Sequence, residues 1–481
     1  MKRRKRLDPG GGAWMGRCLT NTKLFLPSDD FVPLNRRRIT KNTHCMKPIS
    51  ALALMFAAAI TTSSVAADWP QWRGPAFNGS SDERNLPSAW SKTEGVAWSI
   101  ALPGPSASTP VVVSGKIFIS TPDKANKTLH AMCLDRKTGK VLWSHKAAEG
   151  YERDNKSNFS SPSPAADSSR VFFFYGNGPL VAYDHSGKEL WSRSITKDYG
   201  EFAFQWTFST SPLLYDGKLY LQVLQRDVAA NGRGKPSGNE SYLLALDPAT
   251  GKELWRHVRP AEAVAESLEA FTSPVPYTHN GRRELLIAGG DCLTGHDPAT
   301  GKELWRWGTW NPTKIPHWRL VPSPSAGGGV VLACAPKGDP IYAIKAGGNG
   351  MLTDSAIAWK SDKRTVTDDV PTPLFYRGDF FILSDVKKNL SRVDPSTGAV
   401  KWTLDLPGNK KFEASPTGAD GKVYTMNFGG DVVVVDAEAG KIINTIAMGE
   451  PGDDSTRSTV VTAHGQIFIR TNAKLFCVAK K

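Results

Sequence analysis

The sequence has few cysteines and no two of them are adjacent. It holds six in 481 residues, and the four that follow residue 67 are Cys133, Cys292, Cys334 and Cys477. They are far apart, and three of them lie in apolar stretches. This favours buried free thiols over disulfides. Their spacing also gives no zinc ligand set and no Cys-x-x-Cys-His haem motif.

Signatures of the common enzyme classes are missing as well. The chain has no Gly-rich phosphate-binding loop and no Gly-x-Ser-x-Gly turn, and its nine histidines are scattered. Each of those motifs supplies a defined chemical group at a defined turn, so without them no catalytic residue can be named from the sequence. The catalytic residues, if the protein has any, are therefore unknown at this stage.

The sequence also lacks a long apolar run. The longest is about ten residues, within MKPISALALMFAAAITTSSVAAD from Met46, whereas a membrane helix needs about 20. One Lys precedes the run, and the small residues Ala66 and Ala67 follow it, which is the form of a secretory signal peptide. We expect residues 46–67 to be this signal, the protein to be exported to the periplasm or the exterior, and no integral membrane segment to remain after cleavage.

Positive charge is concentrated near the N-terminus. The formal net charge is +14, but residues 1–67 hold 12 Lys or Arg and 3 Asp or Glu, a net +9, which leaves +5 for the rest. A mild excess over a large surface does not indicate a nucleic-acid partner, and we expect none. Residues 1–45 are basic and without pattern. We expect a disordered extension that results from a misassigned start at Met1, with a functional basic tail as the alternative.

One repeated unit stands out against these absences. LDPATGKELWR at 246–256 recurs as HDPATGKELWR at 296–306, and weaker copies start at Asp135, Asp184, Asp394 and Asp436. The Asp and Thr side chains can hold a tight turn closed, and Gly accepts a left-handed backbone there. Apolar runs on both sides of the turn read as two strands of one sheet.

A second signature, Ser/Thr-Pro followed by an apolar strand, precedes each copy. Its prolines are Pro110, Pro162, Pro212, Pro274, Pro324, Pro373 and Pro416, and Val460 takes the eighth position. Eight starts at a period near 50 residues, each with about four short strands, predict an all-β fold, an eight-bladed β-propeller. A sandwich, a row of hairpins or a linear solenoid would not give eight in-phase copies with a fragment at each end.

The ends of the repeated region are complementary. The last period has only three strands, and VAWSI at Trp98 is one strand without a blade. If this N-terminal strand completes the C-terminal blade, the sheet keeps no large open edge. We therefore expect residues 96–481 to form one closed propeller.

The pattern Asp-x-x-Thr-Gly-x-x-x-Trp after an apolar strand resembles the quinoprotein-type (PQQ-like) repeat, over about residues 96–480. The resemblance implies an eight-bladed propeller in which one Trp of each unit packs between neighbouring blades. These tryptophans are Trp98, Trp143, Trp191, Trp255, Trp305, Trp359 and Trp402. Residues 68–95 resemble the leader of secreted propeller proteins of the planctomycete type. We expect them to pack on the outside of the ring and to bury Trp69 and Trp72.

The family includes quinoprotein alcohol dehydrogenases, which hold pyrroloquinoline quinone and calcium, and the propeller of the outer-membrane barrel assembly machinery, which presents loops to partner proteins. This sequence lacks the adjacent cysteines and long insertions of those dehydrogenases, and their calcium ligands match none of its residues. We therefore favour a monomeric binding or scaffold module without cofactor or metal. A quinoprotein-type dehydrogenase with quinone and calcium, or another extracellular enzyme acting on sugars, is the alternative.

The longest loops are expected around one mouth of the channel, at 144–159, 192–208, 224–241, 256–271 and 306–320. Several combine Trp with charged residues, and exposed aromatics beside polar groups mark contact sites for a protein or a saccharide. The candidate contact residues are Glu152, Arg153, Trp206, Trp310, His317, Trp318, Arg319, Asp368, Asp369 and Arg457. The alternative is that these rings only plug the channel.

Overall fold

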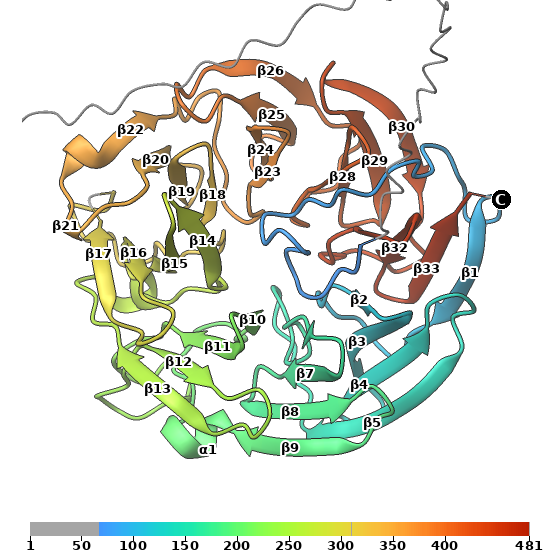
Figure 1. The fold of residues 1–481 in the computed structure, drawn as a ribbon, viewed down its shortest axis with the longest axis horizontal. Coiled ribbons are helices and arrows are strands. Elements are labelled where there is room, and N and C mark those ends of the chain that lie inside the picture. The colour runs from blue at the N-terminus through green and yellow to red at the C-terminus, as the bar shows by residue number, and fades with distance from the viewer. Residues whose placement is uncertain (1–66, 309, 481) are drawn as a thin grey trace, which may run out of the picture. The chain divides into compact units, whose positions relative to one another are not determined.

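The computed structural model describes residues 67–308 and 310–480, which form eight antiparallel sheets arranged in a ring (Figure 1). This is the predicted eight-bladed propeller. The predicted extension 1–45 and, apart from Ala67, the predicted signal peptide 46–67 lie outside the described residues. Within the described part of the chain, no helix combines the length and the apolar character needed to cross a bilayer.

Blades are numbered from the first complete sheet; in blades one to seven the strands run outward from the channel in chain order, and in blade eight β1 is the outermost strand. Blade one contains β2 (Val111–Val113), β3 (Lys116–Asp123), β4 (Thr128–Asp135) and β5 (Val141–Glu149), and blade two contains β6 (Ala165–Ala166), β7 (Arg170–Phe174), β8 (Pro179–Asp184) and β9 (Glu189–Ser194). Blade three contains β10 (Leu213–Tyr215), β11 (Lys218–Val223), β12 (Tyr242–Leu246) and β13 (Glu253–Val258), and blade four contains β14 (Val275–His279), β15 (Arg282–Gly289), β16 (Cys292–His296) and β17 (Glu303–Trp307).

Blades five to eight follow the same plan. Blade five contains β18 (Ser325–Gly327), β19 (Val330–Cys334), β20 (Ile341–Lys345) and β22 (Ile357–Lys360), and blade six contains β23 (Leu374–Tyr376), β24 (Asp379–Ser384), β25 (Asn389–Val393) and β26 (Val400–Asp405). Blade seven contains β27 (Thr417–Ala419), β28 (Lys422–Met426), β29 (Asp431–Asp436) and β30 (Lys441–Ala447), and blade eight contains β31 (Val461–Ala463), β32 (Gln466–Arg470), β33 (Lys474–Ala479) and β1 (Val96–Ala101). The short helices are α1 (Ile195–Tyr199), η1 (Ala265–Leu268) and η2 (Asp354–Ala356), and β21 (Gly350–Met351) is an added strand.

The ring closes as expected. Strand β1 pairs antiparallel with β33, with Trp98 opposite Cys477 and Ser99 opposite Phe476. An N-terminal strand thus completes the C-terminal blade, and hydrogen bonds between the two ends of the repeat region hold the circle shut. The four cysteines of the described residues are free and buried in strands.

The core lies between successive blades. The inner strands are buried along their length because both faces of each sheet contact a neighbour, while the outermost strands, such as β26, alternate between exposed and partly buried residues. Apolar clusters therefore combine two adjacent blades, as where Phe118 of blade one packs with Val171 of blade two. This pattern is typical of an antiparallel sheet whose outermost strand is exposed to solvent.

Most of the repeated tryptophans lie on the turn of the following blade. A Cβ added to the turn glycine of the next blade would lie between 2.5 and 2.8 Å from the indole ring. The pairs are Trp98–Gly139, Trp143–Gly187, Trp191–Gly251, Trp255–Gly301, Trp359–Gly398 and Trp402–Gly440. The Trp359 indole N–H also donates to the Pro395 carbonyl at 2.8 Å, and the Trp98 N–H to Arg136 at 2.9 Å. The glycine is thus required for close approach as well as for its backbone conformation.

Trp305 differs from the other six. Its indole N–H donates to Glu284 Oε2 at 2.6 Å within its own blade, and the ring lies against Gly295 on the adjacent strand. The physical reason is in the next blade, where IKAGGNG lacks the Asp-x-x-Thr-Gly turn. In its place β21 pairs in parallel with β17, with Trp305 opposite Gly350. A backbone ladder joins blades four and five, whereas the tryptophan–glycine contact joins six of the other seven seams; at the seam between blades seven and eight Asn444 takes the Trp position.

The leader segment, residues 68–95, takes a different position from the expected one on the outside of the ring. It bonds to the innermost strands, pairing Trp69 with Val112 in blade one and Ser80 with Gly418 in blade seven. Figure 1 shows it in blue, running into the centre of the ring. Arg73 is buried and donates to the Pro373 and Pro416 carbonyls. The leader therefore crosses the channel at the end where the inner strands finish.

We expect Gly251→Ala to destabilise the propeller more than Gly217→Ala does. Both glycines have a φ near +70°, but nothing lies within 4 Å of a Cβ at Gly217, whereas a Cβ at Gly251 meets the Trp191 ring at 2.6 Å. The left-handed backbone costs about 1–2 kcal/mol in each variant, and overpacking adds ~1–3 kcal/mol at Gly251 only. Denaturant unfolding measures both changes; equal losses would contradict the close contact between blades.

Candidate functional site

A ring of hydroxyls surrounds the channel where the inner strands begin. In this hydroxyl ring the backbone N–H of one blade's Ser or Thr donates to the side-chain oxygen of the Ser or Thr in a neighbouring blade, at 2.9–3.2 Å. Its members are Thr109, Ser163, Ser211, Ser273, Ser323, Thr372, Ser415 and Thr459. These are the residues of the Ser/Thr-Pro signature, and their hydrogen bonds link neighbouring blades around the channel.

Blade two shifts the predicted register of that signature by two residues. The sequence SSPSP offers two prolines, and Pro162 was the expected start. The structure uses Ser163, before Pro164, as the member of the hydroxyl ring. Ser161 instead accepts the backbone N–H of Asn158 at 3.0 Å and helps to fold the preceding loop.

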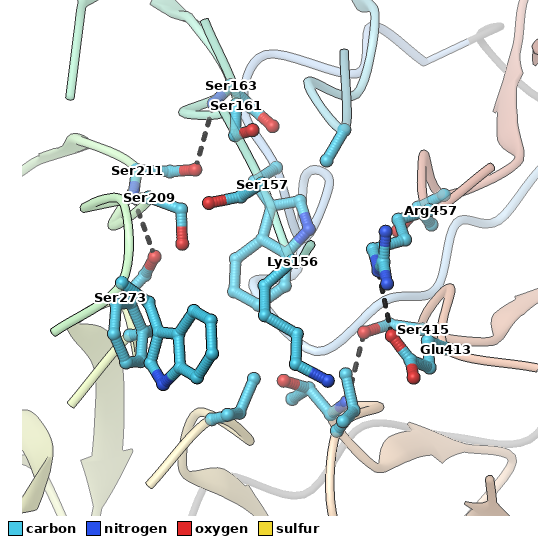
Figure 2. Close-up of a pocket in the computed structure, with 18 of the residues that line it drawn as sticks. Lys156, Ser157, Ser161, Ser163, Ser209, Ser211, Ser273, Glu413, Ser415 and Arg457 are labelled. Carbon is cyan, nitrogen blue, oxygen red and sulfur yellow. Dashed lines mark hydrogen bonds and ion pairs between the residues drawn. The ribbon is translucent and has the colours of Figure 1, made fainter. Parts of the chain in front are cut away.

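A cavity of about 190 Å³ opens above the hydroxyl ring, on the side away from the leader's main path. Figure 2 shows Ser211 and Ser273 on one side, Glu413 and Arg457 on the other, and the Lys156 side chain extending between them. This mouth cavity combines aromatic, hydroxyl and charged groups. They include Trp72, Trp206, Phe271; Ser163, Ser211, Ser273, Thr372, Ser415, Thr459; Lys156, Arg319, Lys411, Arg457; Asp369, Asp385 and Glu413.

Local hydrogen bonds hold the loop that carries Lys156. Asp154 Oδ1 accepts the backbone N–H groups of Lys156 and Ser157 at 2.6 and 2.8 Å, and its Oδ2 accepts that of Thr207 at 2.5 Å. These bonds to the charged form lower the pKa of Asp154, although burial opposes them and is the largest single effect. The turn joins the 144–159 and 192–208 loops and leaves the exposed Lys156 amine without an ion pair in the described residues.

Trp206 and Arg319 are held by the same carboxylate. The Trp206 indole N–H and Arg319 Nη1 both lie 3.2 Å from Glu266 Oε1. Beneath them, Glu269 is fully buried and accepts the Gln205 N–H with both oxygens at 3.0 Å. Burial raises the pKa of Glu269 to about 7 despite the adjacent Arg226. The aromatic side of the cavity is thus built on a buried carboxylate.

The opposite side of the cavity is acidic. Arg457 Nε pairs with Glu413 at 2.7 Å, but Asp385 accepts only the backbone N–H of Asp369 at 3.1 Å. Burial, helped by the nearby Asp369 and Glu413 charges, raises the pKa of Asp385 to about 6. A buried carboxylate in a cavity, ionising near neutral pH, is a common feature of functional sites. Asp368 behind it is fully buried, and the pKa of Asp368 is raised well above its ordinary value by burial and by Asp385.

The candidate residues from the sequence divide into two groups. Trp206, Arg319, Asp369 and Arg457 line the mouth cavity. The other six do not. Arg153 lines a small adjoining pocket, and Glu152 lies 3.8 Å from Arg233 in an exposed ion pair. His317 is exposed outside the cavity, and Asp368 is fully buried beneath it.

Two of the candidate tryptophans lie away from the opening. Trp310 is only 5 % exposed and packs on Trp307, with ring centroids 5.5 Å apart. Trp318 is partly buried against the same apolar cluster of blades four and five. The phenylalanines of the 192–208 loop are likewise buried, with Phe202 and Phe208 centroids 4.7 Å apart. Much of the predicted aromatic rim is therefore loop core.

Several residues of the cavity were missed in the sequence. Lys156 lies in a loop of predicted interest but among many polar residues, and Trp72 was assigned to the outside of the ring. The acidic side comes from blades six to eight, whose loops are short, and so it gave no length signal. Among the cavity residues that were not candidates, only those of the Ser/Thr-Pro signature stood out in the sequence, because the signature repeats. Their chemical role depends on the closed ring.

A calcium-bound quinone, as in the quinoprotein dehydrogenases, would need carboxylate ligands for the calcium in this cavity. Asp369, Asp385 and Glu413 all line the cavity, but no three His, Cys, Asp or Glu side chains among residues 67–308 and 310–480 converge as a metal site would require. Lys156 and Arg319 could pair with an anionic cofactor. The described residues therefore do not assemble the ligands that a calcium-bound quinone would need.

A family model described as outer membrane protein assembly factor BamB matches residues 79–233 and 239–481. The chain belongs to this BamB family. Among solved structures, the fold is similar to a europium-containing methanol dehydrogenase (TM-score 0.64, 11 % identity, 86 % of this chain and 98 % of that one). It is also similar to BamB from Moraxella catarrhalis (TM-score 0.55, 12 % identity, 79 % of this chain and 98 % of that one). At these identities the likeness concerns the fold alone.

Curated relatives of this BamB family member include dehydrogenases. A polyvinylalcohol dehydrogenase of Sphingopyxis sp. is 28 % identical over 250 residues, 48 % of this chain and 34 % of that protein. The quinohemoprotein alcohol dehydrogenase ADH-IIG of Pseudomonas putida is 27 % identical over 168 residues, 34 % of this chain and 21 % of that protein. The match thus spans about a third or less of the relatives' own length.

Asp385→Asn is expected to change how stability depends on pH. The Asp385 pKa is about 6 in the folded chain and near 4 in an unfolded one. Because the unfolded state loses its proton first, this group lowers the free energy of unfolding as pH rises from ~4 to ~6. The variant should match the unsubstituted protein near pH 4 and exceed it at pH 7, by at most ~3 kcal/mol.

Denaturant unfolding at several pH values measures this difference. Asp82→Asn, at an exposed position, is the control and should leave the profile unchanged. The pKa values of Glu269 and Asp291 are also raised by burial. Because both residues are present in every variant, part of the dependence of the free energy of unfolding on pH remains in all of them. Parallel profiles for Asp385→Asn and the unsubstituted protein would contradict the prediction.

Proposed function

We propose that this protein is an exported binding propeller whose mouth cavity takes a unit of an extracellular saccharide. One observation carries the proposal, namely the combination of aromatic faces and free hydroxyl donors in one open cavity. Trp206 and Phe271 supply flat apolar surfaces. Each Ser of the hydroxyl ring accepts one backbone N–H and retains its own O–H as a donor. A sugar presents the same two kinds of surface, apolar faces and a rim of hydroxyls.

The charged groups support a binding role over a structural one. Arg457 with Glu413 and Arg319 with Glu266 form partly buried pairs at the cavity wall, each through one nitrogen, and charged donors form stronger hydrogen bonds to polar ligands than neutral donors do. Lys156 extends freely into the cavity. Cavities that combine apolar lining with a few placed polar groups are the usual form of small-ligand sites. A protein partner, as for BamB-type scaffolds, would use the same loops but not the floor of the cavity.

A second candidate function is quinoprotein-type oxidation, favoured by the names of the curated relatives. Pyrroloquinoline quinone would supply the redox chemistry when bound, and Lys156 and Arg319 are the residues that would hold its carboxylates. The proposal of a binding module predicts that added quinone and calcium give no dye reduction with alcohols or aldoses. Steady turnover under these conditions would move the assignment to the dehydrogenase.

We also propose export to the periplasm or exterior, consistent with the signal-like segment 46–67, and a monomeric state. Proteins of the BamB family match the propeller over most of its length. Fractionation of cells that express the full chain, with N-terminal sequencing of the mature protein, tests export. A protein retained in the cytosol with residues 46–67 intact would contradict it.

Saccharide binding is expected to depend on Trp206 and Arg319. In calorimetric titrations of soluble polysaccharides and their oligomers, Trp206→Ala and Arg319→Ala should each weaken binding by ~2 kcal/mol or more, as at hot-spot positions. His317→Ala, on the exposed surface of a neighbouring loop, is the matched control and should bind normally. The melting temperatures should stay within a few degrees. Stability losses without any change in binding would show that these side chains only plug the mouth.

A further inference from the structure

Arg470 is a buried cation without an anionic partner. It ends β32 and is 0 % exposed. Its Nη1 donates to the carbonyl oxygens of Ser108 and Ser120 at 3.0 and 2.8 Å, across the seam between blade eight and blade one. Among the described residues no carboxylate lies within ion-pair distance of it. A guanidinium cannot lose its charge in a protein, so its burial requires compensation.

The remaining donors of Arg470 are unused. Neither Nε nor Nη2 has a hydrogen-bond partner, and the buried hydroxyls of Ser108, Ser120 and Tyr175 have none apart from a contact between Ser120 and Tyr175. Contacts connect these residues to Arg470 or to one another. The Ser108 and Ser120 carbonyls bind Arg470, and the Ser120 hydroxyl is close enough to Tyr175 to counteract part of the rise that burial causes in the pKa of that tyrosine. Buried unsatisfied polar groups in this number are unusual in native proteins.

Two other buried arginines, Arg259 and Arg73, differ from Arg470 in their partners. Arg259 uses all three of its nitrogen atoms, donating to Thr294, Gly289 and Cys292 at 2.9–3.0 Å. Arg73 has carbonyl partners for both terminal nitrogens. Both are satisfied by protein acceptors over most of the guanidinium. Only at Arg470 do one edge of the guanidinium and a group of hydroxyl donors lack acceptors together.

We propose that Arg470, with the hydroxyls of Ser108, Ser120 and Tyr175, binds a small monovalent anion of the size of chloride at the seam where the propeller closes. Every unused group around the site can donate a hydrogen bond, and the one charged group is positive. An anion accepts all of these donors and neutralises the guanidinium. A water molecule could accept only two of them and would leave the charge uncompensated.

Halide-dependent stability tests this proposal. Thermal unfolding is followed as chloride or bromide is raised from millimolar to half-molar, with sodium gluconate replacing the halide so that the ionic strength stays constant. Binding to the folded state alone raises the midpoint with the logarithm of halide concentration above its dissociation constant. We expect a rise of a few degrees in the full-length protein. A midpoint that does not respond to halide at constant ionic strength would overturn the proposal.

Three variants assign the effect to the site. Arg470→Met should abolish the halide response. Tyr175→Phe removes one hydroxyl donor but keeps the Arg470 charge and the aromatic ring, so it should weaken the response. Arg259→Met removes an equally buried arginine whose partners are protein atoms, so it should lower stability and keep the full response. If Arg470→Met fails to fold, Tyr175→Phe and Ser120→Ala carry the test. A halide response that is unchanged in these variants would contradict the site.

Bromide also reports directly. Crystals soaked in sodium bromide should give an anomalous peak beside the Arg470 guanidinium and the Ser120 and Tyr175 hydroxyls. Density at this place without anomalous signal would identify bound water alone and would overturn the proposal. Arg470, Ser108, Ser120 and Tyr175 do not line the mouth cavity, although the neighbouring Ala107 does, so a bromide peak beside Arg470 is distinguishable from a ligand in the cavity.

Discussion

Truncation after Arg470 is expected to abolish cooperative unfolding. It removes β33, which pairs with both β32 and β1 in blade eight. Leu475, Phe476, Cys477 and Val478 are all buried, and each large apolar side chain contributes about 1.5–3 kcal/mol. Their sum is comparable to the total stability of a typical domain, about 5–15 kcal/mol. Trp98 would also lose its partner strand and its place on blade one.

Circular dichroism and calorimetry of the truncated chain measure this result. The control removes only residues 480–481, which lie beyond β33, and should melt like the full chain. We expect the longer truncation to give a broad transition and to bind hydrophobic dyes, because the edges of blades one and eight become exposed. A sharp transition at the original temperature would show that the ring does not depend on the β1–β33 pairing.

Trp310→Ala is expected to cause a large loss of stability and no loss of binding. Trp310 packs on Trp307, which in turn lies 5.1 Å from Tyr342 between blades four and five. Truncation of a buried tryptophan costs about 3–5 kcal/mol. His317→Ala, seven residues further along the same loop and exposed, should change the free energy of unfolding by less than ~0.5 kcal/mol.

Paired measurements of unfolding and saccharide binding distinguish the alternatives for this loop. A contact role for Trp310 would appear as lost binding with stability retained. The structure favours the opposite result, because Asn311 folds the loop inward. Its side chain accepts the Ile315 N–H at 2.8 Å and donates to the Ile315 carbonyl at 3.1 Å and to Asp291 at 2.7 Å.

The propeller could be predicted from the sequence because its signals repeat. Eight starts, seven of them Ser/Thr-Pro, and the complementary end fragments required a ring, and the β1–β33 pair confirms the predicted closure. Trp305 shows where the reasoning by repetition ends. Its own copy of the motif is perfect, but its packing depends on a turn in the next blade, and that turn is degraded. A contact between units cannot be inferred from one unit alone.

The mouth cavity could be predicted only in outline. Loop length and aromatic content identified Trp206 and Arg319, which line it, but the same criteria selected Trp310, which is buried. The sequence places no constraint on which rings of a loop turn inward, since that depends on hydrogen bonds such as those of Asn311. Lys156 and Asp385 come from distant blades and meet only through the curvature of the ring.

The leader segment gives the channel a bottom. Trp72 lines both the mouth cavity and a small pocket on the leader's side, and the leader bonds to the inner strands of blades one and seven. The propeller is therefore a cup with one entrance and not a tube. A polymer can be held by its end or by a protruding side group, but it cannot be threaded through. Any ligand must leave by the way it came, so the mouth loops alone determine how long it stays bound.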